Sequence, residues 1–383
     1  LQQVSLSMDG LLERFSALAV SSVGRRAFAG VYLIGGVASA FALPDTPDEI
    51  SRIADIRAVL GGASYSFFWP PGNMAVILAN PLFHADVLPD VQAVRLFNFL
   101  LSAPPILWLL LRCRVPLALG VALVAMPFMW LVTATASQQG LMLALLVVLL
   151  QSALDGRRAA LVAAAAGLYF VNPAMLPVIP GGFFLAALLG QPTPHAARAA
   201  LLGVIPFAAV VAFVWILTGD LRPTLSGNGA SNLWLGNNPD PLSHRGVATR
   251  PLPSDLLAAT FEFMRQETLA FVMNLLRKIT LYWVPWDYMR SGLGGDLQAV
   301  FFGYVAVVQA TIYATAIALR HSVRPGALTT AIAIALLAWA LYSLFFVKIR
   351  FRVPFDLLIL AAVMMPRRDR TARANDGPEP PWA

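Results

Sequence analysis

Charge is what this chain of 383 residues has least of, because only 12% of its residues are charged. A soluble domain usually contains about 25% charged residues. Here 58% of the residues are hydrophobic instead, and the mean hydropathy is +0.70. A water-soluble core cannot hide this much apolar surface, so the composition predicts an integral membrane protein.

Several functional signatures are also missing. The single cysteine, Cys113, excludes a disulfide framework within the chain. The sequence has no Walker loop, no dinucleotide-binding glycine motif and no cluster of metal ligands. The net charge of +7 comes from cations scattered in short loops, which argues against a nucleic-acid partner. We assign no metal to the histidines, which are isolated in sequence: His84, His195, His244 and His321.

About ten hydrophobic segments have close to the length that crosses a hydrocarbon core. Prolines at 173, 177 and 180 leave two alternatives for the fifth and sixth segments, two spans or a re-entrant pair. We therefore predict an all-α integral membrane protein of about ten transmembrane helices with helical outer loops. The segments are 27–43, 94–111, 116–135, 140–154, 159–171, 175–189, 199–218, 297–319, 326–346 and 353–365.

The arginines predict the orientation, because they gather at alternate segment ends and an excess of cations marks the cytoplasmic side. Both termini are then cytoplasmic, and the long connections 44–93 and 219–296 lie outside. We divide the chain into an amphipathic or leader segment at 1–24, a membrane domain at 25–366 and a polar cytoplasmic tail at 367–383.

An acidic pair, Asp48 and Glu49, follows the first hydrophobic segment, in a polar stretch that predicts a short helix. A carboxylate at the mouth of a membrane protein can act as a general base on a lipid-linked substrate. The same residues, with Thr46 and Pro47, also suit the capped start of a solvated helix. The sequence leaves both interpretations open.

Cations on the predicted outer side need an explanation. Lys348, Arg350 and Arg352 break the positive-inside pattern just before the last segment. They either extend toward outer-leaflet headgroups or grip an anionic phosphate. Residues 254–286 predict an amphipathic helix that ends with Arg277 and Lys278 beside an aromatic belt typical of a membrane interface.

The order of these elements resembles the GT-C superfamily of membrane glycosyltransferases. The match rests on an outer acidic PDE after the first segment, then WPPG, VRLFNFLL, NLWLGNNP, KITLYWVP and RFRVPFDLLILAA. It covers roughly residues 27–365, and is nearest to the branch of protein O-mannosyltransferases and lipid A aminoarabinose transferases. None of the motifs is very specific alone, and their order carries the resemblance.

The resemblance implies inverting transfer of a sugar from a polyprenyl-phosphate donor to a hydroxyl of a lipid or glycan acceptor. The expected location is a bacterial inner membrane, with the reaction on the periplasmic side and membrane lipids or membrane proteins as further partners. It implies Asp48 as the catalytic acid position, with Glu49 beside it. The residues expected at the donor phosphate are Lys278, Lys348, Arg350 and Arg352, and those expected to orient donor or acceptor are Arg52, Arg95, Gln138, Gln139 and Asn232.

Two departures from the family pattern leave alternatives open. Gln138 and Gln139 stand where many members have a second acidic residue, and Asn172-Pro173 replaces a frequent Arg-Pro. An amide can orient a hydroxyl but cannot act as a base. The chain is then an enzyme that relies on Asp48, an enzyme with an unusual acceptor, or a non-catalytic scaffold or subunit. Whether a divalent cation assists stays open. A transporter fits less well, because the sequence shows no internal repeat.

Overall fold

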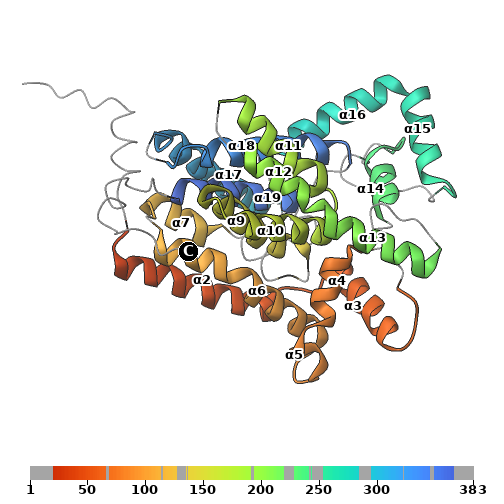
Figure 1. The fold of residues 1–383 in the computed structure, drawn as a ribbon, viewed down its shortest axis with the longest axis horizontal. Coiled ribbons are helices and arrows are strands. Elements are labelled where there is room, and N and C mark those ends of the chain that lie inside the picture. The colour runs from red at the N-terminus through yellow and green to blue at the C-terminus, as the bar shows by residue number, and fades with distance from the viewer. Residues whose placement is uncertain are drawn as a thin grey trace, which may run out of the picture.

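The computed structural model describes residues 20–65, 69–113, 115–126, 135, 137–190, 194–219, 228–240, 243, 253–283, 295–321, 323–345 and 349–365. Every regular element in these residues is a helix, which confirms the predicted all-α class for them (Figure 1). The helices are α2 (Ser22–Ala42), α3 (Pro47–Leu60), α4 (Pro71–Leu78), α5 (Pro81–His84), α6 (Asp90–Arg112), α7 (Leu117–Ala125), α9 (Gln138–Asp155), α10 (Arg158–Val171), α11 (Met175–Leu188), α12 (Pro194–Leu202), α13 (Val204–Thr218), α14 (Asn228–Gly236), α15 (Leu256–Gln266), α16 (Thr268–Leu281), α17 (Gly295–Ala318), α18 (Ala327–Ser343) and α19 (Ile349–Met364).

A helix lies at each of the ten predicted apolar segments, although the seventh is divided into α12 and α13 at Gly203. In the described residues, three helical stretches are long and apolar enough to cross a membrane, namely 90–112, 138–155 and 195–216. A fourth is added if α2 and α3, bent by 76°, form one broken span. Shorter apolar helices lie at 158–171, 175–188, 303–318 and 327–343. By length and composition, the described residues therefore contain three or four segments able to span a membrane.

The helices run between two ends of the bundle, and the first of these is rich in arginine. Arg25 Nη1 donates to the carbonyl oxygens of Leu111 and Cys113 at 3.2 and 3.1 Å, joining the start of α2 to the end of α6. Arg324 Nη1 contacts Asp155 Oδ1 at 2.8 Å at the end of α9. We call this side the arginine end.

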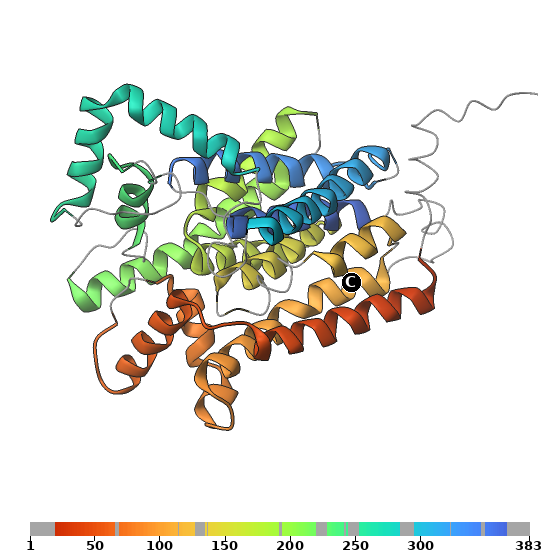
Figure 2. The same ribbon diagram turned by 180° about the vertical axis from the view of Figure 1, so that it is seen from behind.

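The opposite side carries both long connections, and we call it the loop end. The α3–α5 segment and the α14–α16 segment lie there together, in orange and in green to teal in both views (Figures 1 and 2). The start of α9 also lies at this end, because Asn98 Nδ2 of α6 donates to the Thr135 carbonyl oxygen at 3.0 Å. The two connections predicted to share one side of the membrane thus share one end of the bundle.

Close helix contacts hold the bundle together. Helix α9 is buried along most of its length and packs against α6, α10, α18 and α19. A Cβ atom at Gly36 of α2 would overlap the Phe99 ring of α6, and one at Gly182 of α11 would overlap Ile334 of α18. Small residues that let two backbones approach are typical of helix pairs in membranes.

The amphipathic stretch predicted as one helix over 254–286 is two helices in the structure. Glu267 separates α15 from α16, with backbone angles of φ −115° and ψ 46° that leave the helical region. The stretch therefore turns a corner at Glu267, and α15 and α16 run in different directions at the loop end, as Figure 1 shows. Residues 284–286 lie outside the described residues.

Candidate functional site

The acidic pair lies in the first turn of α3, and its two carboxylates have different surroundings. Thr46 is the N-cap: its hydroxyl accepts from Glu49 N at 3.3 Å, and Glu49 Oε2 accepts from Thr46 N at 3.0 Å. This reciprocal pair is a capping box. Glu49 is buried, whereas Asp48 is half-buried at the second helical position. The capping role considered for Asp48 therefore belongs to Thr46 and Glu49.

Arg95 of α6 fixes the corner between α2 and α3. Its Nε and Nη2 atoms contact the two carboxylate oxygens of Glu49 at 2.8 and 2.7 Å. It also donates to the carbonyl oxygens of Leu43 and Pro44, at 2.6 and 2.9 Å, where α2 ends. Arg95 is 0% exposed and Glu49 1%. Glu49 is thus committed to a buried bidentate pair with Arg95, and Asp48 is the more exposed of the two first-turn carboxylates.

Arg52 lies one turn after Asp48, and the structure brings it together with another predicted residue, Gln138. Arg52 Nη2 donates to Gln138 Oε1 at 2.8 Å, and its Nη1 donates to Asn73 Oδ1 at 3.3 Å. The guanidinium carbon lies 4.3 Å from the centre of the Trp69 ring, a cation–π distance. Arg52 is 3% exposed. A buried cation therefore lies one helical turn after Asp48 on α3.

Buried polar atoms without partners surround this cluster. Among the described residues, Asn73 Nδ2, Asn98 Oδ1 and Gln139 Oε1 are buried and form no hydrogen bond. They come from α4, α6 and the start of α9, all at the loop end. A buried polar atom normally has a partner, so these three require water or a ligand. Gln139, predicted to orient a substrate, is one of them.

Lys278 of α16 is a buried cation with neutral partners. Its Nζ atom contacts Asn237 Oδ1 at 2.7 Å and the carbonyl oxygens of Gly236 and Leu344 at 3.2 and 3.4 Å. The residue is 0% exposed, and no carboxylate pairs with it among the described residues. Burial lowers the pKa of the Lys278 ammonium group to about 7. A cation in this position gains from a neighbouring anion.

Arg352 of α19 has an acidic partner that the sequence analysis did not identify. Its Nε contacts Asp356 Oδ2 at 2.9 Å, and its Nη1 donates to the Tyr282 carbonyl oxygen at 2.9 Å. Asp356 Oδ1 accepts a hydrogen bond from the Tyr313 hydroxyl. Arg352 Nη2 is buried and has no partner among the described residues. The four-residue spacing of Arg352 and Asp356 was the signal available for this pair.

Asn172 connects the start of α9 with α18. Its Nδ2 donates to the Tyr342 hydroxyl at 2.7 Å and lies 3.4 Å from Met142 Sδ. The Tyr342 ring stacks on Phe351, with 5.0 Å between ring centres and 5° between planes. Asn172 therefore links Met142 of α9 to Tyr342 of α18, whose ring stacks on Phe351 of α19.

The remaining predicted residues are Asn232, Lys348 and Arg350. Asn232 lies half-buried on α14, and Arg350 lies in the first turn of α19. Lys348 and the side chain of Arg350 lie outside the described residues. In the described part of the chain, no three His, Cys, Asp or Glu side chains gather as metal ligands would.

Two of the cavities lined by described residues bear on the proposed site. One, of about 750 Å³, lies between α14, α15 and α16. The other, of about 640 Å³, is apolar and is lined by α4, α6, α9, α10 and α13. Neither is lined by Asp48 or Arg352, so neither is a cavity joining those two residues.

Comparison with family models, curated proteins and solved structures finds no match to this chain. The function is therefore argued from the residues and their geometry.

Proposed function

We propose that the protein transfers a sugar, with inversion, from a polyprenyl-phosphate donor to an acceptor hydroxyl at the loop end. The observation that carries the proposal is the gathering of three buried cations, Arg52, Lys278 and Arg352, at the end where α3 presents Asp48. Buried charge is costly in a membrane protein and usually serves a function. The cations supply what a lipid-linked phosphate needs, and the half-buried carboxylate supplies a base. The order of motifs shared with GT-C glycosyltransferases supports the same reading.

In this mechanism Asp48 accepts the proton of the acceptor hydroxyl. The acceptor oxygen forms a bond to the anomeric carbon while the bond from that carbon to the phosphate oxygen breaks. The polyprenyl phosphate leaves as an anion, so it needs cations and no proton. Among the described residues, the Arg352 Nη2 atom is a buried cationic donor without a hydrogen bond. Lys278 Nζ already contacts three neutral oxygens, so it would exchange one of them for the phosphate.

Donor binding is expected to weaken as the pH rises through the pKa of Lys278. That pKa is lowered to about 7, so the ammonium form that attracts phosphate prevails at pH 6 and is lost by pH 8. We expect the Kd for polyprenyl-phosphate-linked mannose to rise by about tenfold over this range, as for a binding step that takes up one proton. The charge of that phosphodiester does not change in the same interval.

Lys278→Met removes the titrating group at similar length. Its Kd is expected to be independent of pH and close to that of the parent at pH 8. Arg277→Gln, an exposed cation on the same helix, is the matched control and should keep the parent's pH dependence. A Kd that changes equally in all three proteins would remove Lys278 from the donor site.

We also propose a ten-span topology in a bacterial inner membrane, with the arginine end and both termini cytoplasmic. Ala63→Cys and Glu267→Cys at the loop end are expected to react with an impermeant thiol reagent added to spheroplasts, and Ala159→Cys at the arginine end is not. These positions are exposed, whereas Gly236 in α14 is buried and would hide a cysteine. Cys113 is buried, so the background is low. Labelling of Ala159→Cys alone would reverse the orientation.

A second candidate is a non-catalytic scaffold or subunit of a membrane complex. It is favoured by two buried ion pairs, Glu49 with Arg95 and Arg352 with Asp356. In each pair the charges compensate one another, as a structural role requires. Purified parent protein that transfers no sugar from any of several donor lipids, yet copurifies with a membrane protein, would favour this candidate.

A further inference from the structure

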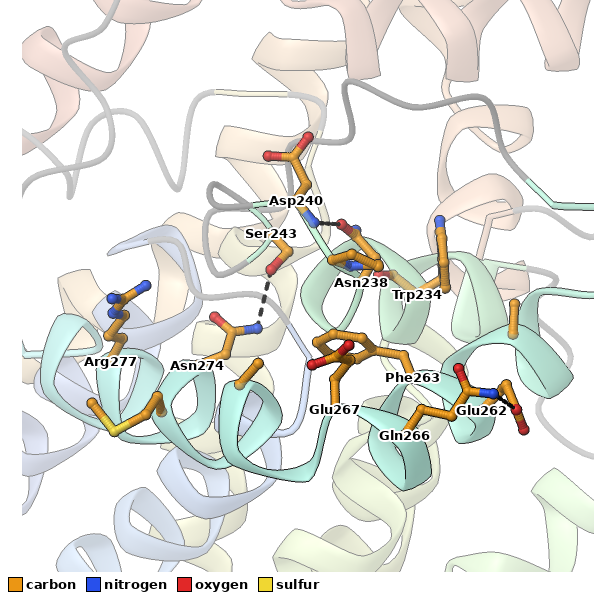
Figure 3. A pocket seen from close by; sticks show the side chains of 14 residues that line it. Trp234, Asn238, Asp240, Ser243, Glu262, Phe263, Gln266, Glu267, Asn274 and Arg277 are labelled. Carbon is orange, nitrogen blue, oxygen red and sulfur yellow. Dashed lines mark hydrogen bonds between the residues drawn. The ribbon is translucent and has the colours of Figure 1, made fainter.

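The cavity between α14, α15 and α16 has the lining of a ligand site. It adjoins Lys278, because Asn274 in its wall and Lys278 donate to the same Gly236 carbonyl oxygen. Its volume of about 750 Å³ is within the usual range of roughly 300–1,000 Å³ for small-molecule pockets. Figure 3 shows side chains from all three helices around it. Asp48, Lys278 and Arg352 do not line it, so it requires a role of its own.

The buried part of the wall includes two aromatic residues and the amide of Asn274. Trp234 and Phe263 are 8% and 7% exposed, and both line the cavity. Asn274 is 7% exposed, and its Nδ2 donates to Gly236 O at 2.8 Å and to Ser243 Oγ at 3.1 Å (Figure 3). Its side-chain oxygen accepts no hydrogen bond from the described residues. The pocket thus combines apolar rings with a fixed, buried acceptor.

Charged side chains line the cavity unevenly. Glu262, Glu267 and Arg277 are exposed, whereas Asp240 is buried in the wall. Glu262 is paired with Arg265 at 2.8 Å, outside the lining, while Glu267 forms no ion pair within the described residues. A phosphate placed beside the exposed Glu267 carboxylate would be repelled by it, so this part of the pocket suits an uncharged ligand better than a second lipid phosphate. The carboxylates do not converge as metal ligands, since no such group forms in the described part of the chain.

We propose that this pocket binds a neutral, hydroxyl-rich ligand, that is, an uncharged glycan. Sugar hydroxyls are donors, and the pocket offers the acceptors they need in Asn274 Oδ1 and the Glu267 carboxylate. The C–H face of a sugar ring is apolar and packs against an aromatic ring such as Phe263. The proposal goes beyond the transfer reaction, because it requires no catalysis and no contact with a donor lipid.

The test is titration of the full-length protein in detergent, followed by calorimetry. The probes are four neutral oligosaccharides (mannotetraose, cellotetraose, maltotetraose and chitotetraose), with a hyaluronan tetrasaccharide as the anionic probe and tetralysine as the cationic one. We expect at least one neutral probe to bind, and to bind at least tenfold more tightly than the two charged probes. Failure of all four neutral probes, or tighter binding of either charged probe, would overturn the proposal.

Variants locate the binding in this pocket. Glu267→Gln weakens a charge-assisted hydrogen bond, and Phe263→Leu removes the stacking ring at similar volume, so each is expected to raise the Kd about tenfold. Asp86→Asn, an exposed carboxylate on the α5–α6 turn, is the matched control and should bind as the parent does. Asp48→Asn should also bind normally, which separates this pocket from the transfer site. Parent-like binding by both pocket variants would place the glycan elsewhere.

Discussion

Replacing Asp48 by asparagine is expected to lower the rate of sugar transfer by about 10²–10⁴-fold, the usual contribution of a general base. The substitution keeps the size of the side chain and removes its basicity. The fold should tolerate the change, because Thr46 and Glu49, and not Asp48, cap helix α3. Transfer from a polyprenyl-phosphate-linked sugar and the melting temperature of the purified protein are the two measurements.

Asp55→Asn is the matched control, since it makes the same change on the same helix about two turns later. It should transfer sugar at the parent rate. Glu49→Gln should instead lower the melting temperature, because it leaves the buried Arg95 without its carboxylate. Parent-like turnover by Asp48→Asn would remove Asp48 as the base, whatever the other two variants do.

The helices are the part of the fold that the sequence predicts well. Apolar runs long enough to approach the width of a membrane leave the backbone only its own hydrogen bonds. In the described residues, a helix lies within each of the ten predicted runs. The start of α3 was also readable, because Thr46 followed three residues later by Glu49 is a capping-box pattern. Such signals are local, so one sequence is enough to recognise them.

Side-chain contacts between residues far apart in sequence cannot be predicted from such local patterns. Arg95 is 46 positions from Glu49, and nothing in either local pattern indicates that they meet. The break at Glu267 was missed because the apolar spacing of α15 continues into α16 with little interruption. Asp356 lies inside the last predicted apolar segment, so the composition of that segment conceals its charge. Asp356 lies four residues after Arg352 and pairs with it, so Arg352 cannot be expected to bind a phosphate only.

The single substitution Arg352→Met is therefore expected to destabilise the protein, by about 3–5 kcal/mol if it behaves as other broken buried ion pairs do. From the sequence alone, loss of Arg352 should impair donor binding more than stability. The structure places Arg352 and Asp356 at 1% exposure each, so removing the cation leaves a buried carboxylate without its partner. Arg352→Lys should rescue poorly, because an ammonium group cannot reach both Asp356 and the Tyr282 carbonyl oxygen as the guanidinium does.

The double variant Arg352→Met/Asp356→Leu separates stability from donor binding. Replacing both members of a buried pair by apolar side chains is often neutral or stabilising, so the melting temperature should return close to that of the parent. If the Arg352 Nη2 atom contacts the donor phosphate, this stable protein will still bind polyprenyl phosphate more weakly. If the pair serves only to join α19 to α17 through Tyr313, the double variant will bind the lipid as the parent does. A stable double variant with unchanged lipid affinity would thus confine Arg352 to a structural role and leave Lys278 as the buried cation to test at the phosphate.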